Sequence, residues 1–347
     1  MTESAVPPII REAERFRAAL LTREAAAAGR LVRAYAGIQQ RLEQGAEALI
    51  ASIGGEAMSP NQIRRLARFR QLQAQVEDEL RKYLNFVEIE LRERIAAEIG
   101  AGLLEAEALV GATLPAALRA EVMAATWNKL DTASVETLLG FLAPDSPLTK
   151  RLTALAGDLA TAIGEELVKG LALGLNPRQV ARLLQRTGGM GLTSALRYAR
   201  TAQLWAYRES SRAAYLANGN IVGSWMWFAD LVGPNTCSAC IAMHGQVFPN
   251  TERLDDHWSG RCKDVPVVNW AALGVDLPPL DYGPTGPEWF GMQDPARQLQ
   301  ILGPSKFALY QAGGLDFSRL VKQVTDDVFG PMKIEATLHE LLGKPAA

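Results

Sequence analysis

The stretch IVGSWMWFADLVGPNTCSACIAMHGQVFPNTERLDDHWSGRC, residues 221–262, separates two kinds of sequence. Before it, apolar residues recur at every third or fourth position, which is typical of amphipathic helices. Within it, β-branched and aromatic residues follow one another, so we expect a strand over residues 221–228 and a short second strand over residues 246–248. The chain is therefore predicted to be mainly α, with a small α+β module in its C-terminal part.

This stretch also holds all three cysteines and two of the three histidines of the chain. Cys237 and Cys240 are separated by two residues, a spacing that can turn two sulfurs toward one point and is typical of tetrahedral zinc sites. Cys262 offers a third sulfur and His257 a nitrogen, with His244 as the alternative histidine. Thiolate and imidazole ligands select zinc over hard cations such as magnesium. The sequence predicts one bound zinc ion, and a core of buried thiols without metal is the alternative.

Length and composition limit the class of protein. The 347 residues, of which 48% are hydrophobic and 21% charged, are typical of a globular chain with two or three compact units. The net charge of −2 gives no general attraction to nucleic acid or acidic membranes. No apolar run approaches the ~20 residues of a membrane helix. Residues 1–8 lack the pattern of a signal peptide, and three crowded cysteines favour a reducing compartment, so we expect a protein made in a cytoplasm.

Two long helical patterns fill residues 9–99. They are interrupted at Gly54-Gly55, and the second starts at Ser59-Pro60, where serine can cap the helix and proline can occupy its first turn. We expect the two helices to pack as an antiparallel hairpin. The second carries a basic run, which is either a solvated helix face or a surface that binds an acidic partner through complementary charge. The run consists of Arg64, Arg65, Arg68 and Arg70.

Composition divides the chain into four segments. They are an N-terminal helical region (1–145), a second helical region (146–219), the Cys/His module with short strands (220–290), and C-terminal helices (291–347).

Glycine, proline and capping residues predict the element boundaries within these segments. We expect a boundary at Gly100-Ala101-Gly102, a flexible joint at residues 187–191 (TGGMG), and little regular structure over residues 266–287. Residues 317–329 are expected to be helical after an N-cap at Asp316. Thr337 and Glu340 form a capping box for a closing helix.

The order of motifs around the cluster resembles that of a known family. Leu175-Asn176-Pro177, Tyr198-Ala199-Arg200-Thr201 and Trp225 precede Cys237-x2-Cys240, His244-Gly245, His257 and Arg261-Cys262. This order is similar to that in the head-morphogenesis or minor head proteins of tailed double-stranded DNA bacteriophages, the family of the F protein of phage Mu. The resemblance covers residues 148–328, about half of the chain. The family usually has His-Pro-x-Cys-Arg-Cys where this chain has HWSGRC (residues 257–262), so Gly260 replaces one potential cysteine ligand.

The resemblance implies a structural role in the assembly of a phage head. Its members dock onto the portal protein or onto the major capsid or scaffold protein, and assist genome packaging or ejection. They are made in the host cytoplasm and act inside the capsid or at the portal vertex of the virion. A protein in this role can also contact double-stranded DNA, and the role involves no membrane.

Two other functions would use the Cys/His cluster. A ββα-metal nuclease would use His257 as general base, but it needs a second imidazole or an asparagine at the metal, and the chain offers only Asn269 and the distant His339. A zinc-stapled DNA-binding module would use Arg261 and Lys263, but neighbouring acidic residues offset their charge.

Other enzyme classes find less support in the sequence. A transferase of ADP-ribose needs a Glu-x-Glu turn, but Glu88-Ile89-Glu90 lies in a helical pattern, and no phosphate-binding glycine loop is present. We therefore expect no enzyme activity. Most of the tryptophans in the last third of the chain are expected to lie in the core of the module rather than on a docking surface. These are Trp225, Trp227, Trp258, Trp270 and Trp289.

Overall fold

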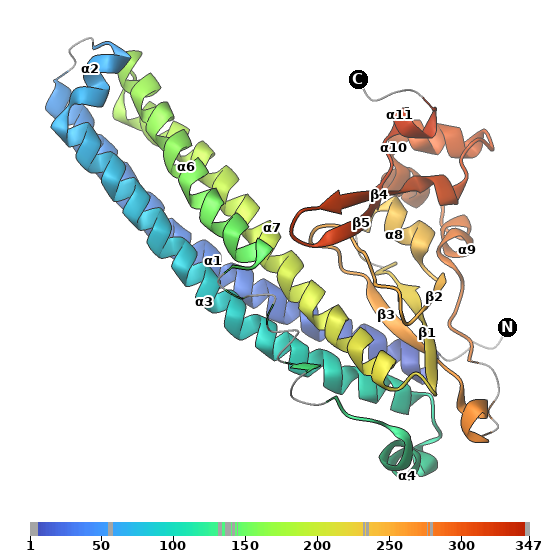
Figure 1. Cartoon of the computed structure of the whole chain (residues 1–347). Helices are drawn as coiled ribbons and strands as arrows, with labels where there is room; N and C mark the ends of the chain where they lie inside the picture. Colours follow the sequence, from blue (N-terminus) through green and yellow to red (C-terminus); the bar gives the residue numbers. More distant parts are fainter. Residues whose placement is uncertain are drawn as a thin grey trace. The chain divides into compact units, whose positions relative to one another are not determined.

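The chain is mostly helical and divides into two compact units (Figure 1). The computed structural model describes residues 6–343 except 55–57, 131–133, 136–139, 141–142, 144, 232, 234–235, 276 and 278–279. One unit, here called the bundle unit, contains residues 23–95 and 139–203. The other, the module unit, contains residues 1–22, 96–138 and 204–347. Both include parts of α1 (Pro8–Ile53), α3 (Ala67–Ala112) and α7 (Pro177–Ala217).

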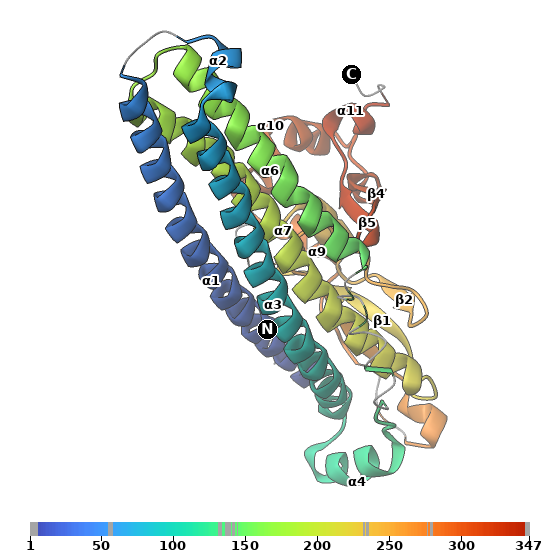
Figure 2. The ribbon, with the colours of Figure 1, turned by 60° about the vertical axis from the view of Figure 1, so that its left-hand side comes forward.

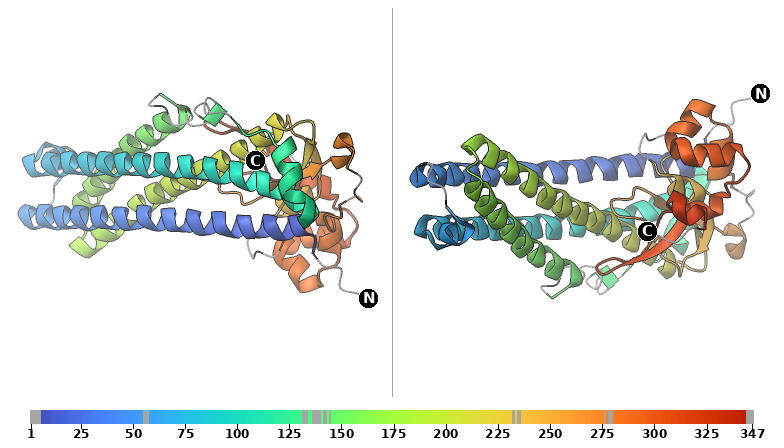
Figure 3. Two further views of the ribbon diagram at one scale, coloured as in Figure 1. Left: turned by 90° about the horizontal axis from the view of Figure 1, so that it is seen from below. Right: turned by 90° about the horizontal axis from the view of Figure 1, so that it is seen from above.

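The bundle unit is held together by apolar stripes on α1, α3, α7 and α6 (Pro147–Ala172) (Figures 2 and 3). On α1, Leu31, Tyr35, Ile38 and Leu42 are buried, at the spacing that places side chains on one face of a helix. The rings of Tyr35 and Tyr83 pack edge to face, with centroids 5.2 Å apart. The ion pairs Arg30–Glu90 and Arg41–Glu79 follow the same antiparallel register, so the predicted hairpin is confirmed.

The start of the second hairpin helix differs from the expectation in one respect. Ser59 caps α2 (Pro60–Arg65), as predicted, and forms a capping box with Gln62, but the helix ends at Arg65 because the backbone of Leu66 is extended (φ −60°, ψ 130°). On an uninterrupted helix, Ile63 and Phe69 would point about 120° apart. The break at Leu66 lets both become buried, and α3 starts only at Ala67. The basic run is thus shared between two helices. Gly55 lies outside the described residues.

Two glycine-rich stretches lie inside helices and do not interrupt them. Residues 187–191 belong to α7, and Gly100-Ala101-Gly102 belongs to α3, so the predicted joint and boundary were wrong. A Cβ atom at Gly188 would come within 2.2 Å of the Tyr35 hydroxyl, and one at Gly191 within 2.3 Å of a Leu159 methyl. At Gly102 it would lie 2.0 Å from the Ser210 hydroxyl. Here glycine allows close approach between helices rather than a change of backbone direction.

A three-stranded antiparallel sheet organises the module unit. Its central strand β1 (Val222–Phe228) pairs with β2 (Val247–Pro249) on one side and with β3 (Lys263–Val268) on the other. The two predicted strands are confirmed, and β3 extends into the proline-rich stretch that was expected to be irregular. Side chains alternate along β1: Met226 and Phe228 pack with residues of α1 and α3, whereas Trp225 and Trp227 pack with cysteine residues and α8 (Ser238–Met243).

The C-terminal part contains a hairpin where a helix was expected. Residues 317–329 form a short 3₁₀ turn, η3 (Phe317–Leu320), followed by β4 (Val321–Asp326), which pairs with β5 (Gly330–Glu335). Gly330, with φ of 79°, takes the left-handed conformation that the turn requires. Asp316 caps the 3₁₀ turn, and the Thr337–Glu340 capping box of α11 (Leu338–Leu341) is confirmed. The described residues also form α4 (Ala116–Thr126), η2 (Trp270–Leu273), α9 (Gly286–Gly291) and α10 (Pro295–Gln311), which bends at Gly303.

Of the five tryptophans in the last third of the chain, three lie in the core, as expected of most of them. Trp225, Trp227 and Trp270 are buried, and Trp258 and Trp289 are half-buried. Trp225 stacks on Phe248 with ring centroids 4.8 Å apart. None of the helices in the described ranges combines the length and the apolar character that crossing a bilayer requires.

Candidate metal centre

The first two ligands come from the start of α8. Cys237 is the N-cap of this helix, and its sulfur accepts a hydrogen bond from the backbone amide of Cys240 at 3.4 Å. The N-cap side chain and the third helical residue face each other in this geometry, which brings the two sulfurs together. The two cysteines are therefore held side by side by the first turn of a helix, and not by a turn between two strands.

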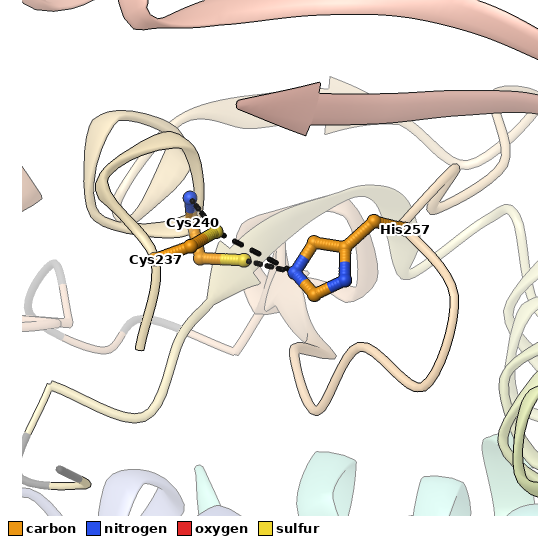
Figure 4. A group of neighbouring side chains, drawn as sticks. All are labelled: Cys237, Cys240 and His257. Atoms are coloured by element: carbon orange, nitrogen blue, oxygen red, sulfur yellow. Dashed lines mark hydrogen bonds between the residues drawn. The ribbon is translucent and has the colours of Figure 1, made fainter. Parts of the chain in front are cut away.

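His257 points its ring at both sulfurs (Figure 4). Its Nε2 lies 3.5 Å from the sulfur of Cys237 and 3.3 Å from that of Cys240. Its Nδ1 lies 3.0 Å from the carbonyl oxygen of Trp258. A carbonyl can only accept, so Nδ1 donates its proton to Trp258 and Nε2 is the nitrogen available to a metal.

These separations match the size of a tetrahedral metal site. Zinc bonds of roughly 2.3 Å to sulfur and 2.0 Å to nitrogen, at tetrahedral angles, place the two ligand atoms about 3.5 Å apart. The ligand atoms of Cys237, Cys240 and His257 all lie within 4.8 Å of one another. The three side chains already have the spacing of ligands around one ion.

Cys262 joins this group through Cys240. The sulfurs of Cys240 and Cys262 and a carboxylate oxygen of Asp256 also lie within 4.8 Å of one another, and all three side chains are buried. The structure thus brings together the four predicted ligands, and a group formed by Cys237, Cys240, His257 and Cys262 could hold a metal ion.

A buried ion pair fixes the loop that carries His257 and Cys262. The Asp256 carboxylate accepts hydrogen bonds from the backbone amides of His257 (2.9 Å) and Cys262 (3.1 Å) and from the Arg208 guanidinium (2.9 Å). Arg208, on α7, also donates to the carbonyl oxygens of Cys262 and Gly260. Sequence analysis gave neither charged residue a role in supporting the site. Arg208 lies between Tyr207 and Glu209 in a helical pattern, and nothing in that pattern indicates its partner.

The structure explains why glycine, and not cysteine, occupies position 260. A Cβ atom at this position would lie 2.2 Å from the carboxylate carbon of Asp256. The Asp256 carboxylate therefore fills the space that a cysteine side chain would need in this loop. The missing cysteine and the buried aspartate are two parts of one arrangement.

His244 belongs to neither ligand group. Its Nδ1 accepts a hydrogen bond from the backbone amide of Ala229 at 3.0 Å, and its ring packs on Phe228. Burial, reinforced by the charge of Arg17, lowers the pKa of His244 to about 4. The structure thus brings His257, and not His244, to the sulfurs.

The pKa shifts of Cys237 and His257 favour a thiolate beside an imidazolium. A hydrogen bond from Cys240, together with those from His257 and opposed by burial, lowers the pKa of Cys237 to about 5. Burial works against the charged form of His257, but Cys237 and Asp256 outweigh it and raise the pKa of His257 to about 10. The hydrogen bonds that Cys240 donates to the sulfurs of Cys237 and Cys262, together with burial, raise the pKa of Cys240. Metal binding would replace the Nε2 proton of His257 and release it to solvent.

The ligands line a hollow of about 230 Å³. Asp230, Thr236 and Arg261 contribute to its wall.

The arginines of the basic run lie in the bundle unit, apart in sequence from the ligands. Arg64 and Arg65 end α2, Arg68 and Arg70 begin α3, and all four are exposed.

Comparison with protein-family models, with curated proteins and with solved structures finds no match for this chain. Its function is therefore inferred from its own residues.

Proposed function

We propose that this chain is a minor head protein of a tailed phage, a structural protein whose C-terminal module is stapled by zinc. The observation that supports the staple is the placement of Nε2 of His257 at 3.5 and 3.3 Å from two sulfurs at a helix start. The head role is supported by the order of motifs from Leu175 to Cys262, and by the helical region that precedes the cluster.

Zinc is the metal that the ligand chemistry favours. Three thiolates and one imidazole form a soft, closed set of four ligands, which suits zinc and leaves no position for a reacting water. The sheet that the site supports has three short strands. The sulfurs of Cys240 and Cys262 lie in one apolar cluster with Trp225 and Trp227, so metal binding contributes to the folding free energy of this part of the module unit.

The surroundings of His257 argue against the nuclease alternative. A general base needs a free nitrogen that faces the attacking water. Here Nδ1 is bonded to the Trp258 carbonyl, and Nε2 faces two sulfurs. Neither ligand group among the described residues contains a second imidazole. We therefore propose a role without enzyme activity.

Docking in this proposal uses the bundle unit. The exposed run of Arg64, Arg65, Arg68 and Arg70 is suited to a negatively charged partner in the head, either an acidic surface of the portal, major capsid or scaffold protein or double-stranded DNA. In this role the chain would act inside the capsid or at the portal vertex of the virion, after synthesis in the host cytoplasm. It would assist head assembly, genome packaging or ejection.

Co-expression of this chain with portal and coat proteins, followed by sedimentation, tests the proposal. We expect the chain to sediment with heads or with the portal. Reversing the charge of the four arginines to glutamate should reduce the sedimenting fraction severalfold while the far-UV spectrum stays unchanged. If the wild-type chain stays soluble while normal heads form, the head role is wrong.

A further inference from the structure

One end of the bundle unit is rich in exposed arginines, although Glu43 of α1 also reaches it and accepts a hydrogen bond from Gln185. Residues 58–76 and 167–186 contain no aspartate or glutamate, although the whole chain has a net charge of −2. The first segment includes α2, and the second includes the end of α6 and the start of α7. α2 packs against α6, and Figures 1 and 2 both show α2 beside the turn from α6 to α7. The two segments therefore form a common surface, which we call the basic tip.

The basic tip holds seven exposed arginines, and none of them makes an ion pair within the described part of the chain. The only hydrogen bonds of their guanidinium groups go to backbone carbonyls: Arg70 donates to Arg65, and Arg182 to Arg178. Elsewhere in the bundle unit, exposed arginines such as Arg81 and Arg92 are paired with carboxylates. The seven are Arg64, Arg65, Arg68, Arg70, Arg178, Arg182 and Arg186.

Three of these arginines form a regular row. Arg178, Arg182 and Arg186 follow one another at four-residue steps on α7, so they share one face of the helix about 6 Å apart along its axis. A guanidinium group presents a planar fork of donors that matches two oxygens of a phosphate. A row of such groups suits a ligand with repeated phosphates.

The remaining surface of the basic tip favours nucleic acid over an acidic protein. Protein interfaces are anchored by large apolar and aromatic side chains. Within the described residues 58–76 and 167–186, Leu173 is the one exposed large apolar side chain. The other exposed side chains between the arginines include amides, which bind phosphate oxygens together with arginine. Examples are Asn61, Gln62, Gln71 and Gln179.

We propose that the basic tip binds the phosphate backbone of double-stranded nucleic acid, independently of base sequence. Single-stranded nucleic acid is usually held by exposed aromatic side chains, and the one aromatic residue of these two segments, Phe69, is buried. The inference stands on charges in the bundle unit alone. It requires neither the metal centre nor the head role.

Fluorescence anisotropy of a labelled 30-base-pair duplex of arbitrary sequence, with the full-length chain, tests the proposal. With seven phosphate contacts, the affinity should fall by about a thousandfold or more between 50 and 200 mM salt. The triple variant Arg178→Gln, Arg182→Gln, Arg186→Gln should bind about tenfold to a hundredfold more weakly at 100 mM salt, and its log–log salt slope should be smaller by about three. Glutamine is chosen because it keeps helix propensity.

A matched variant tests whether binding depends on the arginines of the basic tip or only on the total positive charge of the protein. Arg33→Gln, Arg81→Gln, Arg92→Gln removes three exposed arginines of the same unit outside the tip, and it should change affinity and slope little. Equal weakening by both triple variants would overturn the proposal, as would the absence of duplex binding at 50 mM salt. Displacement of the duplex by polyglutamate at the same charge concentration would assign the tip to an acidic protein instead.

Discussion

The bundle unit and the metal loop of the module unit are stabilised in different ways. In the bundle unit, apolar stripes such as Leu31, Tyr35 and Ile38 repeat along whole helices, so each helical turn adds a similar contribution. In the loop of residues 255–262, a few specific contacts to Asp256, His257 and Cys262 decide the conformation. A repeated pattern tolerates single changes, whereas a set of converging ligands does not.

The largest effect should follow loss of a metal ligand. Cys240 belongs to both ligand groups, so Cys240→Ser should abolish stoichiometric zinc and destabilise the module by several kcal/mol. The fluorescence of the buried Trp225 and Trp227 should shift to longer wavelength while most of the far-UV helical signal persists. Elemental analysis and the two spectra check this.

Chelation of the wild-type protein is the matching control. It should produce the same change in fluorescence, and Cys240→Ser should not respond to chelator further. If the purified wild-type protein is folded and contains no metal, the proposal that zinc stabilises the module is wrong. Loss of the helical signal together with the fluorescence change would show that the two units unfold as one.

The second effect concerns the buried ion pair. Arg208→Gln leaves the Asp256 carboxylate without its charged partner, which should cost about 3–5 kcal/mol of unfolding free energy. Because Arg208 also holds the carbonyls of Cys262 and Gly260, zinc affinity should fall by about tenfold to a hundredfold. Competition with a zinc-binding dye measures the affinity. Arg212→Gln, one turn further along α7 in a partly exposed pair with Glu209, should leave it unchanged.

The third effect should be confined to the bundle unit. Gly188→Ala places a methyl group against the Tyr35 hydroxyl and should lower the unfolding free energy by about 1–3 kcal/mol. Gly189→Ala is the matched control, because nothing lies within 4 Å of its added Cβ, and it should stabilise the helix by about 0.5–1 kcal/mol. Thermal unfolding distinguishes the two, and zinc content should stay at the wild-type value in both. Equal stability of the two variants would mean that α7 does not approach α1 closely at Gly188.

The smallest effect concerns His244, the histidine outside the metal group. Because its pKa in the folded chain is about 4, below the ordinary value of 6.5, the unfolded chain binds a proton first as pH falls. His244 should therefore stabilise the protein fully above pH 6.5 and progressively less between pH 6.5 and 4. At pH 5.5 the loss should be about 1 kcal/mol.

His244→Asn keeps an acceptor for the Ala229 amide and removes this titration. Denaturant unfolding at pH 7.5 and 5.5, with saturating zinc, should show a smaller pH dependence in the variant and an unchanged zinc content. His257→Asn should instead lose zinc. Loss of zinc in His244→Asn would return His244 to the ligand set.

Helices and strands with a strong repeat were predictable from sequence. The stripe on α1, the cap at Ser59 and the alternation of β1 each follow from a local pattern. Glycine misled the prediction because it serves two physical purposes: Gly330 turns a hairpin, whereas Gly188 and Gly191 admit a neighbouring helix. Only the partner helix distinguishes these uses, and it lies far away in sequence.

The metal site was predictable in its ligands and not in its support. The two-residue spacing of Cys237 and Cys240 predicted the first two ligands. The nearness of Cys262 in the sequence predicted the third. The choice between His244 and His257 depends on the turn after Met243, which directs His244 toward Ala229. The Arg208–Asp256 pair joins residues 48 positions apart, and no local pattern predicts such a contact.

The contact between Gly260 and Asp256 also restricts the order in which this loop can change. Replacing Gly260 first forces a side chain into the Asp256 carboxylate. Replacing Asp256 first strands the buried charge of Arg208 and frees two backbone amides. Each single substitution is therefore harmful, and a cysteine at position 260 becomes accessible only together with a change at position 256. We therefore expect reciprocal sign epistasis between positions 256 and 260, in which each single substitution lowers stability and the combined substitution does not.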